Sequence, residues 1–322
     1  MRRKRFALIF ALGCVVCGPG YSAYPEKPVR IVVGYPGGDT TDLVARVVAL
    51  ALAAFFKQPF VIENQPGFNG NLATAKAAKA KPDGHTLLLV SSSFSSNASL
   101  YPELAWHPLR DFIAVSRLAD VHSVLVVLPA VGANTLADFL STVRANPGKL
   151  LFASGGTGSP SHLAAELMKV RAGPLNTLHV PYKGNGPAIA HLLGGHVNAL
   201  FATMPYAHPQ VRSGRVRALA VASPRRAELL PEVPTFEESG VPGVEAPAWN
   251  AIVAPMGTPY DTMVRLNLGV MKVASSALVK ERFAHLGAEA VSDTPDQFGA
   301  YLRAEVEKWA KLVKAAGIVA NE

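Results

Sequence analysis

One arrangement occurs twice in this sequence: an apolar stretch runs into a loop rich in glycine and hydroxyl side chains, and an apolar helical pattern follows. In the first copy residues 29–33 form the stretch, residues 34–42 the loop, and the helix is expected from Leu43. In the second copy the stretch is 150–153 and the loop 154–161. A helix that starts after such a loop directs unpaired N–H groups and its positive dipole end at one point, which favours a small anion. The repetition predicts an anion held between two lobes.

The length of the chain and the order of its patterns indicate an α/β protein of two domains. A chain of 322 residues exceeds what one hydrophobic core usually serves. Apolar strands alternate with helical patterns, which favours parallel sheets that are covered on both faces. The expected strands are 29–33, 60–63, 86–90, 124–128, 150–153, 177–180, 197–201, 216–221 and 249–254. The expected helices after the first include 71–79, 136–144, 187–193, 259–276, 278–286 and 295–316, and the proline-rich stretch 224–247 is expected to cross between the domains.

The first 23 residues have the composition of a cleaved signal peptide. Residues 2–5 are basic, residues 6–17 are apolar, and Ala23 is a small residue at the expected cleavage position. Because the apolar run is too short to span a bilayer, we expect an exported, periplasmic protein. Cys14 and Cys17 would leave with this segment, so no disulfide or cysteine metal site is predicted. Four of the 31 basic residues leave as well, and the remaining 27 against 23 acidic residues argue against nucleic-acid binding.

Neither glycine-rich loop matches a nucleotide-binding pattern, since G-x-G-x-x-G and G-x-x-x-x-G-K-[ST] are both missing. The alternative to an anion site in the first loop is that Thr40 or Thr41 simply caps the helix, with Asp42 in the first turn beside the helix dipole. The second loop has more hydroxyl groups than a cap requires, which favours a ligand.

Ser159 and Ser161 lie beside His162, which raises the hypothesis of a secreted serine hydrolase. The G-x-S-x-G turn is missing, and neighbouring residues at a helix start rarely meet as nucleophile and base. We therefore expect His162 to pack or to cap, and we predict no catalytic residue and no cofactor. His191 and His196 lack the H-E-x-x-H spacing, so no metal site is predicted.

Several motifs in a fixed order resemble the Bug receptors, the extracytoplasmic solute-binding proteins of tripartite tricarboxylate transporters. The segment 24–33 and the Pro-Gly-Gly…Thr-Asp loop after it are similar to the mature start of that family. The resemblance continues through residues 61–67, 82–88, 97–101, 179–184, 217–221 and 254–259. It therefore covers essentially the whole chain after the signal peptide.

The resemblance implies an α/β two-lobed flytrap of the type II periplasmic-binding-protein class with two crossing segments. Lobe 1 is then expected over 24–124 plus 247–322 and lobe 2 over 125–246, after a signal peptide at 1–23. The implied solute is a small organic carboxylate (a dicarboxylate, a tricarboxylate or an aromatic carboxylate), which a monomeric receptor delivers to membrane permease subunits. Carried over by position, the implied site residues are Tyr35, Gly38, Thr40, Thr41, Ser92 and Ser93 in lobe 1 and Ser154, Thr157, Gly158 and Ser159 in lobe 2.

The sequence departs from the family pattern in two places, and the expected site also includes Asp39 and Thr203 from these places. Asp39 stands where relatives often have a second glycine, so its carboxylate must point away from the solute carboxylate or bind a cationic part of the solute. Ala202 and Thr203 replace a common Asp-Asn pair, which favours a plain or aromatic carboxylate over an amino acid.

Two alternatives stay open. Lys183 is expected to be a solvated lysine, with neutralisation of an anion at the cleft rim as the alternative. A sensor subunit for a membrane kinase is the alternative to transport.

Overall fold

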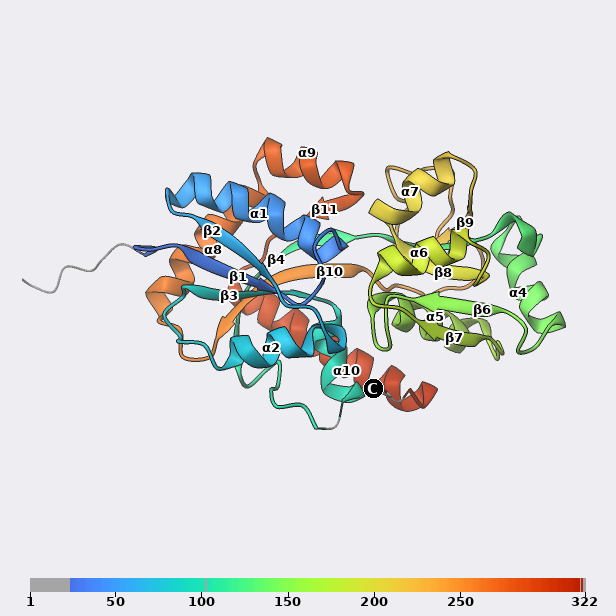
Figure 1. Ribbon diagram of the computed structural model, residues 1–322, viewed down its shortest axis with the longest axis horizontal. Coiled ribbons are helices and arrows are strands. Elements are labelled where there is room, and N and C mark those ends of the chain that lie inside the picture. Colours follow the sequence, from blue (N-terminus) through green and yellow to red (C-terminus); the bar gives the residue numbers. More distant parts are fainter. Residues whose placement is uncertain (1–23, 102, 319, 321–322) are drawn as a thin grey trace, which may run out of the picture.

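The computed structural model describes residues 24–101, 103–318 and 320. The chain forms two lobes side by side, each built around one β-sheet (Figure 1). The expectation of a two-lobed α/β protein is therefore confirmed. The predicted signal peptide, with its cleavage position and both cysteines, lies outside the described residues.

The first lobe contains a six-stranded mixed sheet in the order β11-β4-β10-β3-β1-β2. Its strands are β1 (Val29–Val33), β2 (Phe60–Asn64), β3 (Thr86–Ser91), β4 (Phe112–Val121), β10 (Ala248–Pro255) and β11 (Ala288–Ala290). β1 runs parallel to β2 and β3. β10 runs antiparallel to both β3 and β4, and β11 runs antiparallel to β4.

The second lobe contains a five-stranded mixed sheet in the order β7-β6-β8-β5-β9. Its strands are β5 (Ser123–Val127), β6 (Leu151–Ser154), β7 (Leu178–Pro181), β8 (Ala199–Thr203) and β9 (Arg217–Val221). β6 is parallel to β7 and β8, whereas β5 is antiparallel to β8 and β9. The prediction of parallel sheets is wrong for β5 and β10. β5 is the strand on which the chain enters the second lobe, and β10 is the strand on which it returns to the first. A strand buried on both faces is apolar in either direction, so its pattern does not fix its orientation.

Helices cover the faces of both sheets (Figure 1). They are α1 (Thr40–Phe56), α2 (Asn71–Ala78), α3 (Ser93–Leu100), α4 (Leu136–Ala145), α5 (Pro160–Ala172), α6 (Asn185–Leu193), α7 (Met204–Arg212), α8 (Tyr260–Ala274), α9 (Ala277–His285) and α10 (Pro295–Ala316), with short 3₁₀ turns η1 (Phe68–Gly70) and η2 (Pro129–Val131). The chain passes between the lobes at residue 122 and again through residues 222–247, where no helix or strand is formed. Most of the expected crossing segment at 224–247 packs on the second lobe, where Leu230 and Phe236 are buried, and its role as a crossing segment stays a prediction.

Four elements were missed by the sequence patterns, namely β4, β11, α3 and α7. In β4 the polar residues Ser116, Arg117 and Asp120 interrupt the apolar run. α3 is rich in serine and α7 has Pro209 in its interior, and both residue types are poor helix formers. Tertiary packing overrides these weak local preferences.

The last helix links the two lobes. Its first half packs under the first sheet, where Phe298 and Leu302 are buried, and its second half contributes Trp309 and Val313 to the core of the second lobe. Figure 1 shows α10 ending beside that lobe. The expected apolar stripe of this helix is confirmed, and the domain limits given above stay a prediction.

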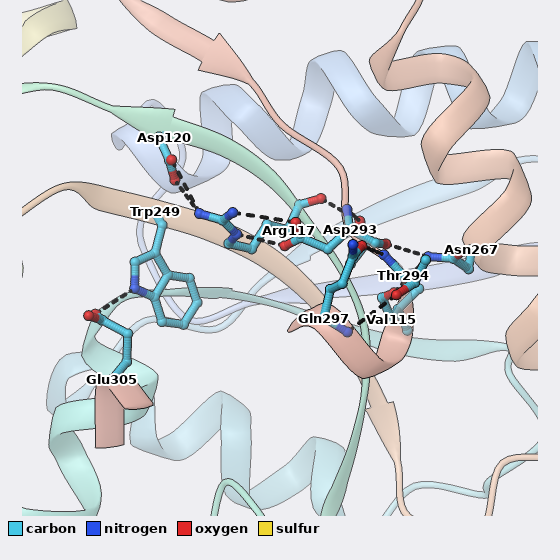
Figure 2. A network of polar contacts seen from close by, with 10 residues as sticks. Val115, Arg117, Asp120, Trp249, Asn267, Asp293, Thr294, Gln297 and Glu305 are labelled. Carbon is cyan, nitrogen blue, oxygen red and sulfur yellow. Dashed lines mark hydrogen bonds and ion pairs between the residues drawn. The ribbon is translucent and has the colours of Figure 1, made fainter. Parts of the chain in front are cut away.

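Part-buried ionic contacts and hydrogen bonds hold α10 against the first sheet (Figure 2). Arg117 on β4 donates from Nε to Oδ2 of Asp293 at 2.7 Å, and its Nη1 lies 3.3 Å from Asp120. The guanidinium also stacks over the ring of Tyr301 at 4.2 Å from its centroid. Glu305 of α10 accepts an indole N–H from Trp249 at 3.0 Å. Because charged groups with hydrogen-bonding partners hold a defined geometry, these contacts fix α10 against β4 and β10.

Candidate functional site

The two glycine-rich loops meet at the junction of the lobes and border a cavity of about 480 Å³. The first lobe lines it with residues 34–36, 66–69 and Tyr101. The second lobe lines it with residues 155–157 and 181–184. These segments follow the carboxyl ends of β1, β2, β6 and β7, where ligands of α/β sheets bind.

Hydrogen bonds connect the lobes beside this cavity. The Thr40 and Thr203 hydroxyl oxygens are 2.8 Å apart, and the Tyr206 hydroxyl donates to the carbonyl of Gly38 at 2.6 Å. On the other side the Ser96 hydroxyl donates to the carbonyl of Gly158 at 3.3 Å. The lobes are therefore in direct contact beside the cavity.

The amides of the first loop bind side chains of the same segment. The N–H of Gly38 donates to Asp42 at 2.8 Å, and the N–H of Thr41 donates to Oδ1 of Asp39 at 3.1 Å. Asp39 is thus the cap of α1, and the alternative that Thr40 or Thr41 caps this helix is wrong. The helix also begins earlier than expected, because an aspartate is as good a cap as a hydroxyl residue.

Asp39 reaches across to the second lobe. Its carboxylate accepts the backbone N–H of Asn185 in the first turn of α6. It also lies close to Gly184, since a Cβ added to this glycine would be 3.4 Å from Oδ2 of Asp39. Asp39 is buried, and this burial raises the pKa of its carboxyl. The side chain therefore occupies the N-terminal end of α6, a position that favours an anion.

The amides of the second loop are used in the same way. Those of Gly155, Gly156 and Gly158 donate to Ser161 Oγ at 2.8 Å, Ser154 Oγ at 3.1 Å and His162 Nδ1 at 3.0 Å.

Thr157 is different from its neighbours in this loop. It lines the cavity, and its N–H and hydroxyl make no hydrogen bond to any other described residue. Its two donors are thus left to a ligand in the cavity.

His162 packs and caps, as expected. Its ring nitrogens face Gly158 at 3.0 Å and Glu166 at 3.7 Å, whereas the Ser159 hydroxyl caps α5 and lies 2.9 Å from the Ser161 hydroxyl. This geometry gives no support to the hydrolase hypothesis, because neither serine hydroxyl bonds to the imidazole. The ring of His162 stacks instead on His179, with the centroids 3.9 Å apart.

The stacked imidazoles are neutral supports under the second loop. Burial lowers the pKa of His162 to about 4 and that of His179 to about 3. His179 Nε2 is 2.6 Å from the Ser154 hydroxyl, so the pair ties β7 to the start of the loop.

The predicted site residues fall into three groups. Tyr35 and Thr157 line the cavity. Contacts between the lobes involve Gly38, Asp39, Thr40, Gly158 and Thr203. Buried positions behind the cavity are taken by Thr41, Ser92, Ser93, Ser154 and Ser159. Whether these residues bind a solute stays a prediction.

Sequence reasoning missed three aromatic residues of the cavity, Phe68, Tyr101 and Tyr182. Phe68 follows the Asn-Gln-Pro-Gly turn and Tyr182 opens the Tyr-Lys-Gly turn, so each stands in a loop where an exposed aromatic is a recognisable signal. Lys183, expected as a solvated lysine, lines the rim of the cavity and is exposed.

The part of the chain that the structure describes contains no cluster of three or more His, Cys, Asp or Glu residues suited to a metal ion. It contains no helix that is long and apolar enough to cross a membrane.

Comparison with known proteins gives a consistent result. Residues 44–318 match the model of the tripartite tricarboxylate transporter family receptor. The chain is 38% identical to BugT of Bordetella pertussis, over 96% of this chain and 97% of that protein. Among solved structures it is similar to an R. palustris protein with adipate (33% identity, TM-score 0.87, 92% of this chain and 99% of that one). It is also similar to MatC from Rhodopseudomonas palustris with bound malate (32% identity, TM-score 0.83, 90% of this chain and 100% of that one).

Proposed function

Because the chain belongs to the tripartite tricarboxylate transporter receptor family, we propose that it captures a small organic carboxylate between its lobes and delivers it to a membrane permease without converting it. The observation that carries the proposal is the cavity of about 480 Å³ bordered by loops of both lobes. The relatives solved with adipate and malate support the ligand class. An exported monomer that works in the periplasm is part of the same proposal.

Binding is coupled to closure in this proposal. The two crossing segments are the hinges, and the contacts between Thr40 and Thr203 and between Tyr206 and Gly38 form when the lobes close. A solute that contacts both lobes then stabilises the closed arrangement by its difference in affinity for the two arrangements.

The proposal is tested by isothermal titration calorimetry of residues 24–322 with adipate, malate, citrate and benzoate. We expect saturable one-site binding of at least one acid, together with a decrease of the radius of gyration in small-angle X-ray scattering. The neutral amides of the same acids are the controls, and they are expected to bind more weakly. If the folded protein binds none of the acids, the proposed function is wrong.

Removing one contact between the lobes should weaken solute binding modestly. Tyr206→Phe deletes the hydroxyl that donates to Gly38 and leaves the ring in place. A neutral hydrogen bond contributes about 1 kcal/mol, so affinity should fall about fivefold in calorimetry. Tyr260→Phe is the control, because Tyr260 is 80% exposed at the start of α8. Equal affinities for the wild type and Tyr206→Phe would contradict a role of this contact in closure.

A further inference from the structure

The walls of the cavity between the lobes are unusually aromatic. Tyr35, Phe68 and Tyr101 line it from the first lobe, and Tyr182 lines it from the second. Lys183 is the one charged side chain among the described residues that line it. A ligand that fits such walls has a flat apolar body and little negative charge.

The tyrosines present their rings to the cavity more than their hydroxyl groups. The Tyr35 hydroxyl lies 2.8 Å from Ser91 Oγ and 3.0 Å from Ser93 Oγ, inside the first lobe. The Tyr182 hydroxyl lies 3.1 Å from Nδ1 of His191. Because these hydroxyls already have partners, a ligand gains mainly ring contacts from both side chains.

Phe68 is held in the cavity at a cost to the protein. Its side chain is 49% exposed and its backbone has a φ of 45°, in the left-handed region that a bulky side chain rarely adopts. An exposed apolar ring on a strained backbone gains nothing from the fold around it, and such strain is commonly found at ligand sites. Phe68 also borders a second pocket beside Leu72 and Trp106, so its ring stands between the two and is one of the wall groups that a ligand in the cavity contacts.

The polar end of the cavity lies on the second lobe. Thr157 offers an N–H and a hydroxyl, and Lys183 adds a positive charge. The two loops that carry them are adjacent, since the N–H of Gly184 donates to the carbonyl of Gly155 at 3.0 Å. These groups suit one carboxylate.

The anion-favouring position next to Gly184, which lines the cavity, is already occupied by Asp39. The nearby N-terminal end of α6 already binds the carboxylate of Asp39, through the N–H of Asn185. A dianionic solute would therefore bring its second charge to a place whose donor is taken and whose neighbour is another carboxyl group.

We propose that the solute is an aromatic monocarboxylate, with its ring between Phe68, Tyr35 and Tyr182 and its carboxylate at Thr157 and Lys183. This inference rests on the proposed function, because it specifies the solute of the same cavity. The volume of about 480 Å³ accommodates one substituted ring.

Calorimetry with four acids tests the ligand class. Benzoate is expected to bind about fivefold more tightly than cyclohexanecarboxylate, which has the same charge and a similar size but no aromatic ring. Benzoate is also expected to bind more tightly than terephthalate, which adds a second carboxylate, and than adipate. Tighter binding of adipate, terephthalate or cyclohexanecarboxylate than of benzoate overturns this inference and leaves the proposed function standing. Binding of no carboxylate overturns both.

Two variants test the assigned residues. Phe68→Leu keeps a Cβ and therefore the backbone strain, but it removes the ring, so the preference for benzoate over cyclohexanecarboxylate should disappear. Phe55→Leu, at an exposed phenylalanine of α1 outside the cavity, should keep the preference. Lys183→Met should weaken benzoate about fivefold and leave the affinity for neutral benzamide unchanged. A preserved preference in Phe68→Leu, or equal losses for benzoate and benzamide in Lys183→Met, would contradict the assignment.

Discussion

Replacing Gly158 with alanine is expected to weaken solute binding by between about tenfold and a hundredfold. A Cβ on Gly158 would lie 2.2 Å from Cδ1 of Leu100, which is buried at the end of α3 in contact with the second lobe. Gly158 belongs to the second lobe and α3 to the first, so the added atom obstructs closure. Overpacking of this kind costs about 1–3 kcal/mol, and the cost falls on the closed arrangement alone. The affinity is measured by calorimetry with an acid that the wild type binds.

Gly132→Ala is the matched control for backbone strain. Gly132 has a φ of 78°, close to the 75° of Gly158, and a Cβ there meets no atom within 4 Å. Both substitutions therefore place alanine in the left-handed region, which costs about 1–2 kcal/mol of stability. Only Gly158→Ala should reduce the affinity and increase the radius of gyration of the protein with solute.

A second substitution distinguishes a clash between the lobes from the loss of a contact to the solute. Leu100→Ala removes the atoms that the new methyl group meets, so Gly158→Ala with Leu100→Ala should recover most of the affinity relative to Gly158→Ala. The N–H of Gly158 binds His162 in any case, so the substitution removes no amide that faces the solute. If the double variant binds as weakly as Gly158→Ala, the clash with Leu100 is not the cause of the lost affinity.

Mild acid is expected to destabilise the protein through the stacked histidines. The pKa of His162 is lowered to about 4 and that of His179 to about 3, both by burial, against 6.5 for the unfolded chain. The unfolded chain therefore binds more protons below pH 6.5, and stability falls as the pH falls from 6.5 towards 4. At pH 5 each histidine costs about 2 kcal/mol relative to neutral pH. Lys169 contributes to the low pKa of both rings.

The measurement is the free energy of unfolding in urea between pH 7 and pH 5. The variants are His162→Asn, whose Oδ1 can accept the N–H of Gly158, and His179→Gln, whose side chain can reach Ser154. The double variant should lose most of the dependence on pH in this range. His285→Gln, at an exposed histidine of α9, should retain it. An equally steep dependence in the double variant would show that other groups cause it.

Much of the fold could be predicted from local patterns. The strands predicted at 29–33 and 249–254 and the long last helix at 295–316 are present, because each is a run of residues with one period and clear ends. The orientation of β5 and β10 could not be predicted, because a doubly buried strand has the same pattern in both directions. The sequence offers Thr40 or Thr41 as alternative caps of α1, whereas Asp39 caps this helix, since all three residues are good caps and only their geometry separates them.

The candidate site, like the fold, was predicted in part from the sequence. The sequence by itself determined that two glycine-rich loops would follow strand ends and open helices, and that the chain resembles a family of carboxylate receptors. These are properties of short segments and of their order, which a sequence carries directly.

Only the tertiary structure decided which groups of those loops are left for a solute. The amides of Gly38, Gly155 and Gly158 bind side chains of their own loops and helices, and Phe68 and Tyr182 come from other segments to line the cavity. The physical reason is that a buried N–H takes whichever acceptor the packed fold brings within reach, and that partner is fixed by three-dimensional proximity.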